Sequence, residues 1–215
     1  MLLAHAELVE LVQAGVIDAP REQINGSSID IRLGPMLQVE PLPRLQCPGC
    51  GSTEVRAEAT GYEQEVVGYC PHCFSTGELA LFAVPVDVQQ RQLPHWVTRD
   101  CTAGYRLAPG EFVLAHSQEM FNLPNDISAE YKLKSSLARV GLEHLNAGFI
   151  DSGFHNANLT LEFKNMLRQH SLLLIAGMLC GQLLFFRHAP VADAYSYRQR
   201  GRYNGSRGAV ASKGV

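Results

Sequence analysis

The sequence predicts a mostly β domain, a sandwich or barrel of short strands, with a short N-terminal helix and a small metal-dependent insertion. Short apolar runs alternate with turn-forming residues through much of the chain, and four of its six cysteines fall in one segment. Many short strands joined by regular turns are typical of all-β sandwiches and barrels. A chain of 215 residues is long enough for one substantial core and a small accessory module.

The first element is an amphipathic helix, because apolar residues between positions 5 and 14 recur at helical spacing and Gly15 follows them. An Asn-Gly turn at 25–26 precedes a half-buried strand in which Ile29, Ile31 and Leu33 alternate with polar residues. Further strands are expected at residues 79–88, 111–115, 159–163, 171–175 and 182–186.

Residues 41–78 differ in composition from the rest, so we expect a zinc-ribbon insertion within one domain made of residues 1–40 and 79–215. Two Cys-x-x-Cys pairs, Cys47 with Cys50 and Cys70 with Cys73, are separated by 19 residues. Each pair directs two thiolates at one ion, and two pairs complete a closed tetrahedral site. The spacing therefore predicts structural zinc, which a segment so poor in large apolar residues needs for folding.

Composition limits the classes of partner and the compartment. The net charge is −3, and acidic residues outnumber basic ones in the insertion, so nucleic acid is an unfavourable partner. No apolar run is long enough to cross a bilayer, and the N-terminal residues lack the features of a signal peptide. Cysteines without a secretion signal favour a reducing compartment, so we expect the cytoplasm, with Cys101 and Cys180 buried as small apolar residues.

Four residues between positions 134 and 139 suit the binding of phosphate. Lys134 and Arg139 supply two cations, and Ser135 and Ser136 supply two hydroxyls, all within six residues. Cations, hydroxyls and backbone amides in one short segment are the groups that phosphate oxygens accept hydrogen bonds from.

Two carboxylates follow this segment. Asp151 comes after a glycine-containing turn, and Glu162 lies on an expected strand. Alternation puts Thr160 and Glu162 on one face of that strand and the apolar residues 159, 161 and 163 on the other. A carboxylate in that setting is a candidate general base with a shifted pKa.

The joint pattern resembles the dCTP deaminase family of the dUTPase superfamily. The motifs that carry it are Lys-Ser-Ser-Leu-Ala-Arg at 134–139, Ala-Gly-Phe-Ile-Asp-Ser-Gly-Phe at 147–154, Leu-Thr-Leu-Glu at 159–162 and Gly-Gln-Leu at 181–183. The resemblance covers residues 1–40 and about 105–213. It implies a distorted jelly roll assembled as a homotrimer, with active sites between subunits and Mg²⁺ accompanying the phosphates of a deoxycytidine nucleotide.

The resemblance also implies roles for individual residues. Glu162 is the general base, Ser135 and Arg139 position the attacking water, Ala147 leaves room for the base, and Asp151 contacts the deoxyribose. The substrate-binding residues that it implies are Lys134, Ser135, Ser136, Arg139, His144, Ala147, Asp151, Thr160, Leu161, Glu162, Tyr195, Arg202 and Ser206.

Departures from the family pattern leave several alternatives open. Plain dUTPases lack a glutamate at the position of Glu162, so this residue argues against a dUTPase. Residues 147–154 look more like the bifunctional members, which release dUMP and pyrophosphate. Lys134, Arg202 and Ser206 replace the usual phosphate-binding residues. The substrate is therefore dCTP or another cytosine nucleotide, and the alternatives are a dUTPase without deaminase activity and a non-catalytic nucleotide-binding regulator.

A different zinc chemistry is disfavoured. Zinc-dependent cytidine deaminases use His-x-Glu followed by Pro-Cys-x-x-Cys. His5 and Glu7 have the first spacing, but Gln46 rather than proline precedes Cys47. That interpretation would also leave the second cysteine pair without a role.

Overall fold

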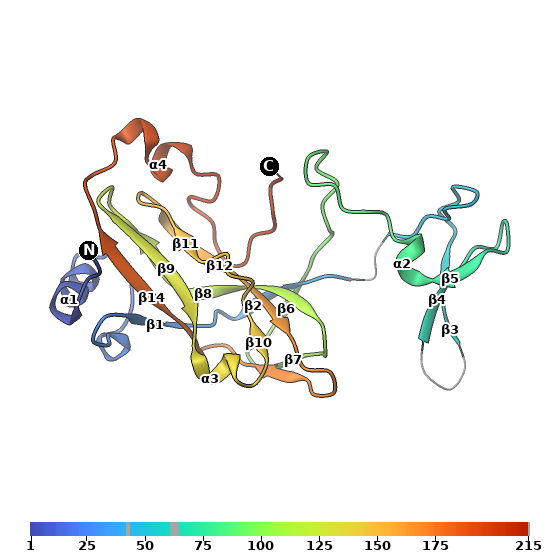
Figure 1. The fold of residues 1–215 in the computed structure, drawn as a ribbon, viewed down its shortest axis with the longest axis horizontal. Helices are drawn as coiled ribbons and strands as arrows, with labels where there is room; N and C mark the ends of the chain where they lie inside the picture. Colours follow the sequence, from blue (N-terminus) through green and yellow to red (C-terminus); the bar gives the residue numbers. More distant parts are fainter. Residues whose placement is uncertain (42–43, 61–64, 215) are drawn as a thin grey trace. The chain divides into compact units, whose positions relative to one another are not determined.

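The chain forms two compact units (Figure 1). The computed structural model describes residues 1–41, 44–60 and 65–214. The first unit combines Met1–Val39 with Val97–Ala211, and the second combines Glu40–Trp96 with the last residues of the chain. The predicted insertion falls in the second unit, and its positions 42–43 and 61–64 lie outside the described residues. No described helix has both the length and the apolar character that crossing a membrane requires.

Three antiparallel sheets build the first unit. The order of the first sheet is β1 (Ile29–Arg32), β14 (Leu179–Arg187), β9 (Ile127–Leu133) and β11 (Phe149–Ile150). The order of the second is β10 (Leu142–Glu143), β12 (His155–Asn165), β8 (Phe112–Asn122), β2 (Met36–Val39) and β6 (Val97–Asp100). The third pairs β13 (Leu172–Leu174) with β7 (Tyr105–Leu107).

The helices of this unit are short. They are α1 (His5–Gln13), α3 (Ser135–Ala138) and α4 (Tyr197–Arg200), with 3-10 turns η1 (Arg21–Gln23) and η3 (Asp193–Tyr195). Helix α1 buries Leu8 and Leu11, as its helical spacing predicts.

One core lies between the sheets of the first unit. Phe121 of β8, Phe163 of β12 and Phe185 of β14 are fully buried in it together with aliphatic residues from β1. Cys101 and Cys180 are buried there too, as predicted. The prediction of a mostly β fold with a short N-terminal helix is confirmed, and among the described strands the sheets stay open rather than closing into a barrel.

Most of the predicted strands are present, and one is wrong. The structure confirms those at 29–33, 111–115, 159–163, 171–175 and 182–186, although β8 and β12 are longer than expected. Residues 79–88 do not form a strand, because they begin with the short helix α2 (Leu79–Phe82). Phe82 on this helix is buried against the cysteine cluster, and that packing overrides the strand-like composition.

The second unit contains a three-stranded antiparallel sheet and the cysteines. Its strands are β3 (Arg56–Thr60), β4 (Glu65–Tyr69) and β5 (Thr76–Glu78). The Phe82 ring covers Gly68 of β4 so closely that a Cβ at Gly68 would lie 2.2 Å from a ring atom. Cys47, Cys70 and Phe82 form the small buried core of this unit.

Candidate active site and metal centre

Glu162 lies half-buried on β12, opposite Leu114 of β8. Its neighbours Leu161 and Phe163 point into the core, so the predicted division of this strand into a polar and an apolar face is confirmed. Burial raises the pKa of the Glu162 carboxyl above its ordinary value, because removing a carboxylate from water disfavours its charged form. A raised pKa makes the carboxylate a stronger base, which is the change that a general base requires.

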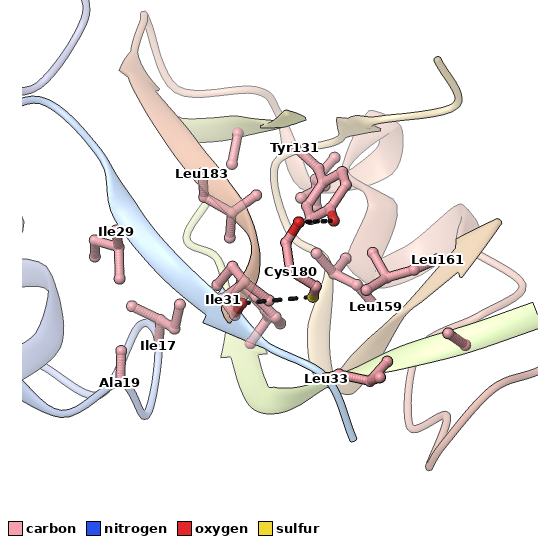
Figure 2. Close-up of a cluster of buried hydrophobic side chains, with 14 of the residues drawn as sticks. Ile17, Ala19, Ile29, Ile31, Leu33, Tyr131, Leu159, Leu161, Cys180 and Leu183 are labelled. Atoms are coloured by element: carbon pink, nitrogen blue, oxygen red, sulfur yellow. Dashed lines mark hydrogen bonds between the residues drawn. The ribbon is translucent and has the colours of Figure 1, made fainter. Parts of the chain in front are cut away.

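Tyr131 of β9 is a neighbour of Glu162 that the sequence motifs did not predict. Its hydroxyl donates a hydrogen bond of 3.2 Å to the Cys180 carbonyl (Figure 2). The Tyr131 ring covers Gly181. Burial first, and then the nearby Cys180 and Glu162, raise the pKa of Tyr131 far above its usual range, so the phenol stays neutral. The alternation of apolar and polar residues over 127–133 is a sequence signal that would have predicted this strand and its buried tyrosine.

His144 and the turn that contains Ala147 pack beside Tyr131. The His144 ring is buried and meets the Tyr131 ring edge-on, with centroids 5.2 Å apart. The backbone N–H of Tyr131 donates a 2.7 Å hydrogen bond to the carbonyl of Gly148. Ala147, the predicted base-selecting residue, is exposed next to this contact. The structure therefore brings Glu162, His144 and the Ala147 turn together around Tyr131.

The predicted phosphate-binding segment is at the start of helix α3. Ser135, Ser136 and Arg139 are exposed there, and the Arg139 N–H donates a 3.0 Å hydrogen bond to the Ser135 carbonyl. Lys134 precedes the helix, and its ammonium forms a 2.8 Å ion pair with Asp30 of β1. In this state the Lys134 charge is neutralised by a carboxylate, a partner that the sequence motifs did not predict.

A second group of predicted residues gathers near the C-terminus. Asp151 is exposed, and both it and Arg202 lie near Tyr197. Burial is the main cause that raises the pKa of Tyr197, and Asp151 raises it further while Arg202 opposes the change. Tyr195 is exposed, and the Arg200 guanidinium lies 5.9 Å from the centre of its ring.

The chain after this group runs along β12. The Ser206 carbonyl accepts a 3.0 Å hydrogen bond from the Asn158 N–H, and the Val210 N–H donates one of 3.0 Å to the Thr160 hydroxyl. These contacts bring residues 206–210 over the same face of β12 that carries Glu162. Among the described residues, no hydrogen bond or ion pair joins Glu162 directly to the other predicted catalytic residues, Ser135, Arg139 and Asp151.

The four predicted metal ligands meet in the second unit. The sulfurs of Cys47, Cys50, Cys70 and Cys73 all lie within 4.8 Å of one another. Two of these separations are 3.4 Å, between Cys47 and Cys73, and 3.6 Å, between Cys50 and Cys70. Zinc held by four thiolates at about 2.3 Å places its sulfurs roughly 3.8 Å apart, so the cluster fits such an ion. Hydrogen bonding from Ser75 lowers the pKa of Cys73 to about 6. A hydrogen bond from the Ser52 backbone acts to lower the pKa of Cys50, but hydrogen bonding with Cys70 raises that pKa to about 12.

Known proteins resemble this chain in sequence and in fold. A sequence model of the family described as dCTP deaminase-like matches residues 81–188, which is half of the chain. The chain belongs to the dCTP deaminase-like family. Two curated relatives of this dCTP deaminase-like chain are named dCTP deaminase, dUMP-forming. The relative from Beutenbergia cavernae is 42% identical over 127 residues. The relative from Pseudarthrobacter chlorophenolicus is 43% identical over 128 residues.

The match to these relatives is partial. Each alignment covers 58% of this chain, and it spans 65% of the first relative and 66% of the second. The crystal structure of 2′-deoxycytidine 5′-triphosphate deaminase from Agrobacterium tumefaciens aligns with 90% of this chain and 50% of its own, with a TM-score of 0.53 and 21% identity. This likeness supports the mostly β fold that the motifs predict.

Proposed function

We propose that this dCTP deaminase-like protein hydrolyses the C4 amino group of a cytosine deoxynucleotide, with dCTP as the first candidate. The observation that carries the proposal is Glu162, a half-buried carboxyl with a raised pKa on the Leu-Thr-Leu-Glu strand. A plain dUTPase needs no glutamate there, whereas a deaminase needs a base to activate water.

In the proposed reaction, Glu162 takes a proton from water as the water oxygen bonds to C4. Glu162 passes this proton to N3 of the ring, then takes the remaining proton from the C4 hydroxyl and delivers it to the amino nitrogen. The C4–nitrogen bond breaks, ammonia leaves, and a C4 carbonyl beside a protonated N3 remains. Ser135 and Arg139 would position the water and stabilise the intermediate through hydrogen bonds and charge. Lys134, Ser136, Arg202 and Ser206 would bind the phosphates, together with the Mg²⁺ that the nucleotide carries.

The dUMP-forming branch is the version of this reaction that we favour. Relatives with about 42% identity carry that name, and residues 147–154 resemble the bifunctional members. In this branch a second water attacks the α-phosphate and releases pyrophosphate. Asp151, which by the resemblance would contact the deoxyribose, is the candidate residue for that second step.

We further propose a homotrimer with active sites between subunits. Large apolar residues stay exposed next to the predicted site, among them Val140 at 50%, Leu145 at 50% and Phe149 at 66% exposure. An exposed apolar patch of this kind is suited to self-association. The cysteine cluster would hold a structural zinc ion outside the reaction, and the cytoplasm stays the expected compartment.

The test is incubation of the purified protein with dCTP and Mg²⁺, followed by separation of the products by anion exchange. We expect dUMP and pyrophosphate; dUTP alone would assign the deaminase without the second step. Glu162→Gln should lower turnover by at least about 100-fold, which is the usual contribution of a general base. Glu10→Gln, which changes an exposed carboxylate on α1, is the matched control and should keep wild-type turnover.

Other outcomes would replace the proposal. Hydrolysis of dUTP without turnover of dCTP would identify a dUTPase and leave Glu162 without a catalytic role. Absence of turnover with dCTP, dCDP, dCMP and modified cytosine nucleotides, combined with tight binding of one of them, would identify a nucleotide-binding regulator. The altered phosphate-binding residues make the survey of phosphorylation states necessary.

A further inference from the structure

The Glu143 carboxylate holds the turn that precedes Ala147. One oxygen, Oε1, accepts hydrogen bonds from two successive backbone N–H groups, that of His144 at 2.8 Å and that of Leu145 at 3.1 Å. Glu143 itself is fixed in β10, where its backbone pairs with Lys164 of β12. The carboxylate therefore ties the turn to the strand that carries Glu162.

The turn needs such a restraint because its backbone is strained. Leu145 and Asn146 have φ values of 57° and 55°, so two successive residues adopt the left-handed conformation. Asparagine tolerates this region, but leucine rarely enters it. Leu145 is half-exposed, so burial of its side chain does little to offset the strain. Hydrogen bonds to the backbone are the remaining local means of holding the conformation.

Because of the strained turn, the residues that follow it, Gly148 and Phe149, lie against β9 near Tyr131. Gly148 approaches β9 so closely that a Cβ there would lie 2.5 Å from the Tyr131 carbonyl oxygen. The Tyr131 N–H bonds the Gly148 carbonyl at 2.7 Å, and Phe149 then pairs with Glu130 as β11 begins. A small change in φ at Leu145 or Asn146 would move Ala147 relative to Tyr131 and Glu162.

We infer that Glu143 is a positioning residue for substrate recognition, because it fixes the left-handed turn at 145–146 and thereby the place of Ala147 beside Tyr131. Glu143 does not touch the reacting atoms in this assignment; it acts through the turn. The inference rests on the proposed function only for its kinetic consequence, because the structural consequence can be measured without substrate.

Kinetic measurements test whether Glu143 affects substrate recognition. Glu143→Ala should raise KM for the cytosine nucleotide by roughly tenfold while kcat changes much less, because hydrogen bonds to a charged group no longer hold the turn. Glu143→Gln keeps an acceptor oxygen and should restore most of the loss. Leu145→Gly removes the left-handed strain, so in the Glu143→Ala background it should also recover part of the KM. Equal effects of Ala and Gln, or no recovery with Leu145→Gly, would overturn the inference.

Hydrogen–deuterium exchange tests the structural half without turnover. In Glu143→Ala the amides of Leu145 and Tyr131 should exchange faster than in the wild type, while those in β8 stay unchanged. Glu7→Ala, which removes a carboxylate that accepts the Ala4 N–H at 3.1 Å, is the control and should alter neither amide. Unchanged exchange in Glu143→Ala would refute the inference. If the wild-type protein proves inactive but Glu143→Ala still exchanges faster than it does, only the proposed function is refuted.

Discussion

Glu162 has opposite consequences for stability and for activity. Burial raises its pKa, so the folded state binds the proton more tightly than the unfolded state does. The stability that this proton linkage contributes is fully present below the unfolded pKa, and it is lost as pH rises through the higher folded pKa. At neutral pH the partly buried charge of Glu162 therefore lowers the stability of the folded protein, although the reaction needs that charge.

Exchange of Glu162 for glutamine should separate the two consequences. Glu162→Gln should lower deamination by at least about 100-fold yet raise the melting temperature at pH 7.5. This gain should shrink as the pH is lowered to 4.5, because more of the wild-type carboxyl is then protonated. Differential scanning calorimetry at both pH values measures it. In parallel, kcat/KM of the wild type should fall as pH drops through the raised pKa. A change in melting temperature that is the same at both pH values would show that Glu162 has no linkage to folding.

At the scale of elements, the sequence predicted correctly the strands that have one strictly apolar face. Its prediction was wrong where contacts between distant segments determine the local structure. The alternation around Glu162 predicted β12, and the two cysteine pairs predicted a single cluster. The segment at 79–82 became a helix because Phe82 packs on the cysteines, a contact that no local pattern contains. Partners such as Asp30 for Lys134 are equally absent from local patterns, because they lie 104 residues apart in sequence.

The second unit should depend on its metal. Among its described residues, the hydrophobic core consists of Cys47, Cys70 and Phe82, a cluster that buries too little apolar surface for a stable fold without further support. Removal of the metal with a chelator should change the fluorescence of Trp96, the single tryptophan of the chain, which lies in this unit. Cys73→Ser should reproduce that change and lower the zinc content. His72→Ala, which alters the knuckle between two ligands, should retain the zinc; an unchanged spectrum in verified metal-free protein would contradict the prediction.

At the scale of the whole molecule, one chain does not connect the predicted catalytic residues. No hydrogen bond or ion pair joins Glu162 to Ser135 or Arg139 among the described residues, although the resemblance assigns all three to one water molecule. The exposed apolar residues Val140 and Phe149 flank the same region. In the proposed trimer, a site that combines Glu162 of one subunit with α3 of another would account for both observations, because symmetric assembly repeats such a shared site at every interface.

Mixing two inactive variants tests the shared site directly. Glu162→Gln and Arg139→Ala should each be inactive alone. In trimers formed by co-expression, about one quarter of the sites would combine an intact Glu162 with an intact Arg139 from another subunit, so about a quarter of wild-type activity should return. The control mixture, Glu162→Gln with Glu162→Ala, should stay inactive. If the first mixture also stays inactive while mass spectrometry shows mixed trimers, then Glu162 and Arg139 act within one chain, and α3 must move towards β12 when the nucleotide binds.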